Sequence, residues 1–137
     1  MSTPTLTPYL NFDGNCAEAM KFYHSILGGD LSMQTFEQAH MSQSPEVKNR
    51  IVHALLKNGT CTFMASDGNM SMNIKFGDNV SMSLVGEDQE KLTNVFNKLA
   101  HGGNVKMPLA KQFWGDTFGM VTDKFGVRWM VNIGKMQ

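Results

Sequence analysis

The sequence contains the same helix signal twice, and this repetition constrains the fold more than any other feature. Residues 15–27 and 88–100 each begin with a helix-capping residue and carry apolar side chains at helical spacing. The caps Asn15 and Asp88 coincide at an offset of 73 residues, and the Gly-Gly pairs that follow the helices coincide at 74. A repeat of this length is half a domain, not a solenoid unit. We therefore expect one domain built from two similar modules with a cleft between them.

The segments around the helices predict strands. Alternation and β-prone composition mark strands in both halves, at 5–12, 30–36, 50–57, 60–66, 80–85, 105–109, 112–122 and 127–133. Asn58-Gly59 is a strong hairpin signal, and the polar segment 37–49 is expected to be a loop. Each half is thus strand, helix, strand, strand, strand, which predicts an α+β fold. Module 1 spans residues 1–68 and module 2 spans 78–137, with a Gly/Asn/Met-rich linker at 69–77.

Composition excludes several classes of protein. The 137 residues include 12 basic and 12 acidic side chains, so no charge footprint for nucleic acid or an anionic membrane is present. No apolar run is long enough to span a bilayer, and the first residues do not resemble a secretory signal. Two cysteines, Cys16 and Cys61, do not make a disulfide framework or a zinc site. We expect a reduced, cytoplasmic protein without nucleic-acid or membrane partners.

Local rules assign roles to a few polar residues. Asn15 and Glu18 have the spacing of a capping box at the first helix. Cys16 lies in the first helical turn, where the helix dipole can lower a thiol pKa, but it also falls on the apolar stripe, which favours a small buried residue. Asp67 and Asp123 precede turn residues, where aspartate is expected for backbone reasons.

Four segments resemble one known family. Residues 8–29 and 113–132 are similar to the opening segment and closing hairpin of PhnB-like proteins, and 53–64 and 66–68 also resemble them. These proteins are a branch of the vicinal oxygen chelate superfamily, which includes glyoxalases and fosfomycin- and bleomycin-resistance proteins. The resemblance implies paired βαβββ modules with curved mixed sheets, usually assembled as a homodimer. Some PhnB-like sequences carry a methyltransferase label, but this sequence lacks the glycine-rich turn typical of cofactor-binding parallel sheets.

The resemblance also implies places for a divalent metal, on the first and last strands of each module. Counting from the helix caps and turn glycines puts these places at Pro8, Ser81, Met130 and Phe63, or at Met64 if the register slips by one. None is a histidine or carboxylate, so we expect no metal and no other cofactor. His24, His40 and His101 read as surface residues, whereas His53 lies either half-buried in a strand or in the cleft.

Without a metal, the expected cleft is lined by aromatic and thioether side chains. Twelve methionines suit either an irregular core or an adaptable apolar pocket. The expected ligand-binding residues are Tyr9, Asn11, His53, Met64, Trp114, Asp116 and Trp129, with Phe63, Met82, Phe113, Phe118 and Asn132 as further lining candidates. Trp114 is favoured because Gly115 and Asp116 beside it suggest an exposed bend.

Three functions are consistent with the sequence. The first is metal-free binding of a small hydrophobic or aromatic compound. The second is a metal-dependent lyase or transferase with displaced ligands. The third is a dimeric scaffold without a ligand. The catalytic residues and the ligand itself are not predicted, because function must be argued from the site.

Overall fold

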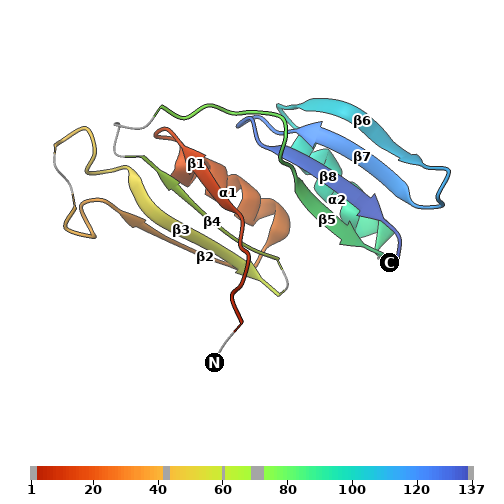
Figure 1. The fold of residues 1–137 in the computed structure, drawn as a ribbon, viewed down its shortest axis with the longest axis horizontal. Coiled ribbons are helices and arrows are strands. Elements are labelled where there is room, and N and C mark those ends of the chain that lie inside the picture. Colours follow the sequence, from red (N-terminus) through yellow and green to blue (C-terminus); the bar gives the residue numbers. More distant parts are fainter. Residues whose placement is uncertain (1–2, 42–43, 60, 69–72, 136–137) are drawn as a thin grey trace. The chain divides into compact units, whose positions relative to one another are not determined.

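The computed structural model describes residues 3–41, 44–59, 61–68 and 73–135, and the chain divides into two compact units, Met1–Lys75 and Phe76–Gln137. Residues 69–72 of the predicted linker lie outside the described residues. The elements of the first unit are β1 (Tyr9–Phe12), α1 (Cys16–Leu27), β2 (Asp30–Thr35), β3 (Ile51–Asn58) and β4 (Cys61–Asp67). Those of the second are β5 (Met82–Gly86), α2 (Gln89–Ala100), β6 (Asn104–Lys111), β7 (Thr117–Thr122) and β8 (Arg128–Ile133) (Figure 1).

The two units have the same topology. The strand orders are β1-β4-β3-β2 and β5-β8-β7-β6. In each sheet the first strand pairs in parallel with the last, and the other pairs are antiparallel. The predicted α+β fold with a repeated βαβββ plan is therefore confirmed. No helix among the described residues is long and apolar enough to cross a membrane.

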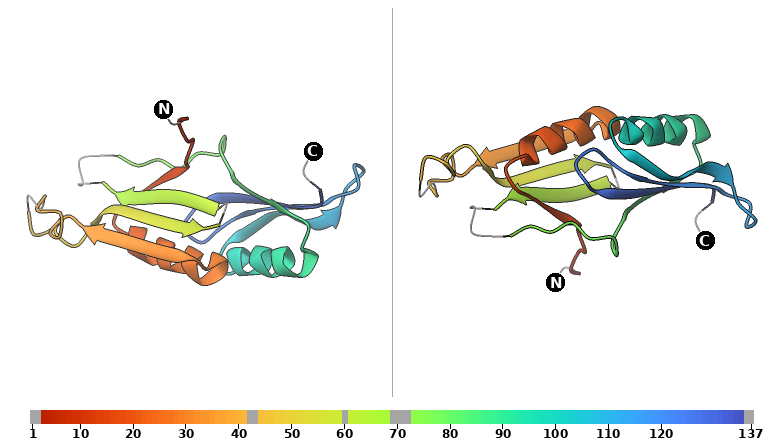
Figure 2. Two further views of the ribbon diagram at one scale, coloured as in Figure 1. Left: turned by 90° about the horizontal axis from the view of Figure 1, so that it is seen from below. Right: turned by 90° about the horizontal axis from the view of Figure 1, so that it is seen from above.

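In each unit the helix covers one face of its own sheet (Figure 2). Tyr23 of α1 packs on Phe63 of β4, with ring centroids 5.9 Å apart. In the second unit a Cβ added to Gly119 of β7 would lie 2.9 Å from the ring of Phe96 on α2, so this residue faces the helix. Side chains alternate along a strand, so the neighbouring residues lie on the opposite face. We call that opposite face of each sheet its helix-free face.

The repeated Gly-Gly pairs end both helices for the same two reasons. Gly28 and Gly102 have φ values of 74° and 77°, which suit glycine because it has no Cβ. A Cβ on Gly29 would lie 2.5 Å from the carbonyl oxygen of Lys57, and one on Gly103 would collide with the carbonyl of Thr122. Each pair thus combines a left-handed turn with close packing against a strand of its own sheet.

The predicted capping box at α1 is wrong. Asn15 stands at the N-cap, but its side chain makes no capping hydrogen bond. The carboxylate of Asp67 takes that place, because its Oδ1 accepts from the backbone N–H groups of Gly14 and Cys16, at 2.8 and 3.0 Å. By contrast, Asp88 caps α2 as predicted, accepting from the N–H of Lys91 at 3.1 Å.

Several predicted strand boundaries also differ from those of the structure. The first strand begins at Tyr9, four residues later than expected. β6 continues through Pro108, since it is an edge strand whose register shifts between Met107 and Ala110 and so does not need every backbone donor. Residues 112–116, predicted as the start of a strand, form a turn in which the N–H of Gly115 donates to the carbonyl of Gln112.

Candidate functional site

Four of the predicted site residues share the helix-free face of the first sheet. Tyr9 of β1 is in register with Met64 of β4, and Asn11 lies two residues further along the same strand face. The rings of Tyr9 and His53 are tilted, with centroids 6.2 Å apart. Tyr9 is 45% exposed and His53 is also exposed. This face therefore carries a phenol, an imidazole, an amide and a thioether within one sheet.

Strand register identifies the partners of Met64 and Met130, two of the places that counting assigned to metal ligands. The N–H of Gly68 donates to Phe12, and that of Gly134 donates to Gly86, so these bonds mark equivalent points in the two sheets. Counting back three residues along each strand gives two pairs on the helix-free faces. These pairs are Tyr9 with Met64, and Ser83 with Met130.

These four positions do not fit a hard divalent cation. They offer a phenol, a hydroxyl and two thioethers, whereas such cations prefer carboxylate oxygens or imidazoles. Three of the places found by counting are displaced. Phe63 is buried under α1, so Met64 takes its place on the helix-free face. Tyr9 and Ser83, not Pro8 and Ser81, are the partners in register of Met64 and Met130. No group of three His, Cys, Asp or Glu side chains that could hold a metal occurs within the described part of the chain.

The helix-free face of the second sheet is mainly apolar with a polar end. Met120 of β7 pairs with Met130 of β8, and Phe118 pairs with Asn132 in the next row. All four side chains are half-buried. The amide of Asn132 donates to the carboxylate of Asp116 at 3.0 Å, so two predicted polar residues meet at this end.

The predicted bend at Trp114 is confirmed. Gly115 has a φ of 101°, and Trp114 is 49% exposed beside the almost fully exposed Phe113. The Trp114 ring contacts Phe113 and Phe118 edge-on, with centroids 5.0 and 6.0 Å away. This aromatic group therefore extends from the β6–β7 turn to the helix-free face. Whether Trp114 contacts a ligand stays a prediction.

Trp129 was expected to line the ligand-binding cleft, but it lies on the buried side of its sheet, facing α2. Its side chain is 2% exposed, and its indole Nε1–H donates to the Oδ2 of Asp123 at 2.8 Å. Its strand neighbour Val131 is fully buried, while Met130 between them is half-buried, so Trp129 belongs to the helix side of the sheet. Met82 is in register with Trp129 and shares that side. We therefore leave both residues out of the candidate site.

Cys16 is not an activated thiol. It is fully buried, and burial together with the nearby Asp67 charge raises its pKa to about 12. Desolvation penalises the thiolate more than the helix N-terminus favours it. The interpretation of Cys16 as a small buried residue is the correct one.

Two features of the second unit were not predicted from the sequence. Arg128 opens β8 in register with Thr122, and its Nε is buried without a hydrogen-bond partner among the described residues. The alternation of apolar residues at 127, 129, 131 and 133 could have placed Arg128 on the helix-free face.

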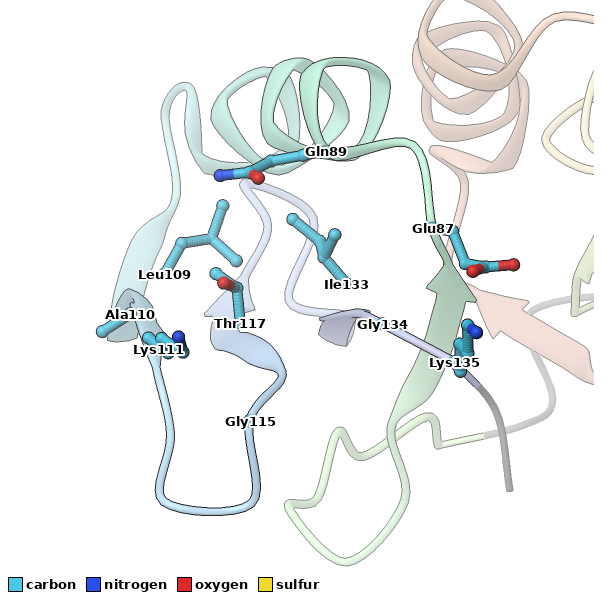
Figure 3. Close-up of a pocket in the computed structure, with 10 residues that line it drawn as sticks. All are labelled: Glu87, Gln89, Leu109, Ala110, Lys111, Gly115, Thr117, Ile133, Gly134 and Lys135. Carbon is cyan, nitrogen blue, oxygen red and sulfur yellow. The ribbon is translucent and has the colours of Figure 1, made fainter.

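The second feature is an open hollow of about 620 Å³ near the start of α2, and no sequence motif marks it. The apolar part of its lining comes from Leu109, Ile133 and the Thr117 side chain. Its rim is polar and carries Gln89, Glu87, Lys111 and Lys135 (Figure 3).

Comparisons with known proteins agree over nearly the whole chain. Residues 4–132 match the family described as 3-demethylubiquinone-9 3-methyltransferase. Protein YjdN of Escherichia coli K12 is 32% identical, over 96% of this chain and 97% of its own.

Solved structures give the same result. Protein PA1353 of Pseudomonas aeruginosa is 40% identical with a TM-score of 0.84, over 98% of this chain and 100% of its own. A Bacillus cereus PhnB protein, described as a putative methyltransferase of the same name, is 28% identical with a TM-score of 0.79, over 96% and 100%. The fosfomycin-resistance protein FosX of Listeria monocytogenes, 9% identical with a TM-score of 0.67 over 99% and 96%, shares the fold alone.

The register of the repeated sheets and these matches lead to one assignment. The chain belongs to the PhnB-like family, described as 3-demethylubiquinone-9 3-methyltransferase, and it has the glyoxalase/bleomycin-resistance fold of the vicinal oxygen chelate superfamily.

Proposed function

We propose that this protein binds a small hydrophobic or aromatic molecule without a metal, on the helix-free faces of its sheets. The observation that carries the proposal is the makeup of the second sheet's helix-free face. There Phe118, Met120 and Met130 form an apolar surface, and the Asp116–Asn132 pair lies at one end. Small-molecule sites are mostly apolar with a few placed polar groups, and this face has that composition.

The first sheet supports the same proposal. Its helix-free face offers Met64 as an adaptable apolar surface and Tyr9 and His53 as polar aromatic groups. Thioether side chains accommodate ligands of irregular shape, and aromatic rings add stacking surface. We include Asn11 as a contact at the edge of the first sheet's helix-free face, and Trp114 as a contact beside Phe118 on the second.

The alternative of a metal-dependent lyase or transferase has weaker support. It requires histidine or carboxylate ligands for the metal. The candidate ligand positions on the paired strands are instead occupied by Tyr9, Met64, Ser83 and Met130. Methyl transfer, which the family description names, finds no glycine-rich cofactor loop in the sequence. A dimeric scaffold without a ligand is the third candidate, and the experiment below separates it from the first.

We further propose a homodimer in the reducing cytoplasm. The resemblance to a family of dimers supports the assembly. The free thiols of Cys16 and Cys61 suit a reducing compartment. Light scattering during size-exclusion chromatography should give twice the chain mass of 15.2 kDa.

The proposal is tested with N-phenyl-1-naphthylamine, a neutral aromatic probe that fluoresces in apolar sites. We expect saturable binding, unchanged by EDTA, in protein that still unfolds cooperatively. Met120→Asp places a charge on the apolar face and should abolish binding. Leu6→Asp adds the same charge to a fully exposed residue before β1 and should bind like the wild type.

The outcomes are distinct. Binding that disappears with EDTA and returns with a divalent metal would support the metal-dependent alternative. Absence of saturable probe binding would favour the scaffold. Equal binding by Met120→Asp and wild type would move the site away from this face.

A further inference from the structure

Arg128 is a cation at the edge of a mainly apolar surface. It is in register with Thr122, and the next row of the same face holds Met120, Met130 and Ser83. Residues two apart along a strand share a face, so Arg128 and Met130 project from the same side of β8. A guanidinium thus adjoins the thioether surface, about 7 Å along the strand from Met130.

This guanidinium lacks the partners that a partly buried cation ordinarily has. Its side chain is half-buried, and its Nε is shielded from solvent with no acceptor among the described residues. In the part of the chain that the structure describes, no carboxylate forms an ion pair with it. Buried polar groups in native proteins are almost always hydrogen-bonded, so an unpartnered donor needs an explanation.

The other arginine shows the contrast. Arg50 donates through Nε to the carbonyl oxygen of Gly68 at 2.6 Å and pairs with the carboxylate of Asp13 at 2.7 Å. Arg50 therefore has a structural role, with its donors used inside the first unit. Arg128 retains donors for a partner from outside the chain.

We propose that Arg128 binds the oxyanion group of the ligand, and that the ligand is a small amphipathic anion. Its carboxylate, sulfonate or phosphate group would pair with the planar fork of Arg128 beside the Thr122 hydroxyl. Its apolar body would lie over Met120 and Met130, with its far end toward Asn132. This inference rests on the proposed function and adds the chemical class of the ligand.

Two probes that differ in one group test the inference. The probe 8-anilino-1-naphthalenesulfonate is N-phenyl-1-naphthylamine with an added sulfonate. We expect Arg128→Gln to weaken binding of the sulfonate about 10- to 100-fold, the range for loss of a charge-assisted hydrogen bond. Binding of the neutral probe should change less than about twofold, which also shows that the variant is folded. Arg128→Lys, which keeps the charge but loses the fork, should give an intermediate loss.

Lys91→Gln provides the matched control. Lys91 is exposed on α2, over the other face of the same sheet, so its loss changes the net charge equally without touching the proposed site. Equal weakening by Lys91→Gln and Arg128→Gln, or equal effects of Arg128→Gln on both probes, would overturn the inference and leave the proposed function intact. Failure of both probes to bind wild-type protein would overturn the two proposals together.

Discussion

The two units share a topology but secure their helices and turns in different ways. Each has a carboxylate that is 3% exposed, Asp67 in the first unit and Asp123 in the second. Asp67 joins elements distant in sequence, because it accepts from the α1 N-terminus and also from the N–H of Ile51 on β3 at 2.9 Å. Asp123 acts locally, accepting from the N–H groups of Phe125 and Val127 at 2.8 and 3.1 Å in its own hairpin.

The difference shows that a repeated fold does not require repeated capping chemistry. In the second unit Asp88 caps α2, and the buried carboxylate Asp123 lies in the β7–β8 hairpin, where it accepts from the Trp129 indole. In the first unit Asn15 makes no side-chain cap, so stability of the α1 N-terminus depends on a residue 51 positions away from Cys16. Five predictions rank these contributions.

Asp67→Ala should have the largest effect. It leaves three backbone donors, on Gly14, Cys16 and Ile51, without their acceptor in a buried site. We expect a loss of about 3–5 kcal/mol in the free energy of unfolding, measured by urea denaturation. Asp78→Ala, at an exposed carboxylate, is the control and should lose less than about 0.5 kcal/mol. A loss below 1 kcal/mol for Asp67→Ala would contradict its role as the cap of α1.

Asp123→Ala should lower the free energy of unfolding less, by about 2–3 kcal/mol. The donors on Phe125 and Val127 belong to the local turn and can reach water when the turn opens. Near-ultraviolet circular dichroism should also change, since the Trp129 indole loses its partner. An unchanged Trp129 signal would show that this hydrogen bond does not orient the ring.

The Cys16 thiol should make stability depend on alkaline pH. Its pKa is raised from 9.0 to about 12 in the folded protein, so only the unfolded chain ionises as pH rises above 9. Stability should therefore fall between pH 9 and 12, by at most about 1.4 kcal/mol per pH unit from this group. Cys16→Ala should remove this part of the slope in urea denaturation at pH 8 and 10.5. Equal slopes for variant and wild type would contradict the raised pKa.

Asp88→Ala tests the local cap of the second unit. It removes one exposed hydrogen bond to Lys91, so a loss of about 1 kcal/mol is expected on thermal or urea unfolding. Asp88→Asn, which retains an acceptor, should recover most of this loss. A cost similar to that of Asp67→Ala would abolish the distinction between local and distant capping.

The smallest effect is expected for Asn15→Ala. The Asn15 side chain makes no capping bond, so the loss should stay below about 0.5 kcal/mol. Combining it with Asp67→Ala tests whether Asn15 can replace the missing carboxylate. A loss of 1 kcal/mol or more in the single variant would mean that Asn15 caps α1 in solution.

Patterns within short segments predicted most of the fold. The helical spacing, the Gly-Gly pairs and the Asn58-Gly59 hairpin depend on neighbouring residues, and both helices and the order of elements along each repeat agree with them. The Asp67 cap could not be predicted, because it depends on the end of β4 meeting the start of α1. The sequence predicted only part of how the candidate side chains are placed in the sheets. Tyr9 and Met64 share a face by register, but Trp129 was misplaced because its role depends on Asp123.

The location of the bound probe would show whether the helix-free face of the second sheet is the ligand site. Amide chemical shifts of 15N-labelled protein should be followed during titration with N-phenyl-1-naphthylamine in the presence of EDTA. We expect the largest shifts on β7 and β8 around Met120 and Met130, with α2 little affected. Shifts confined to the hollow near Gln89, Lys111 and Lys135, or no saturable shifts at all, would contradict a metal-free ligand site on the helix-free face.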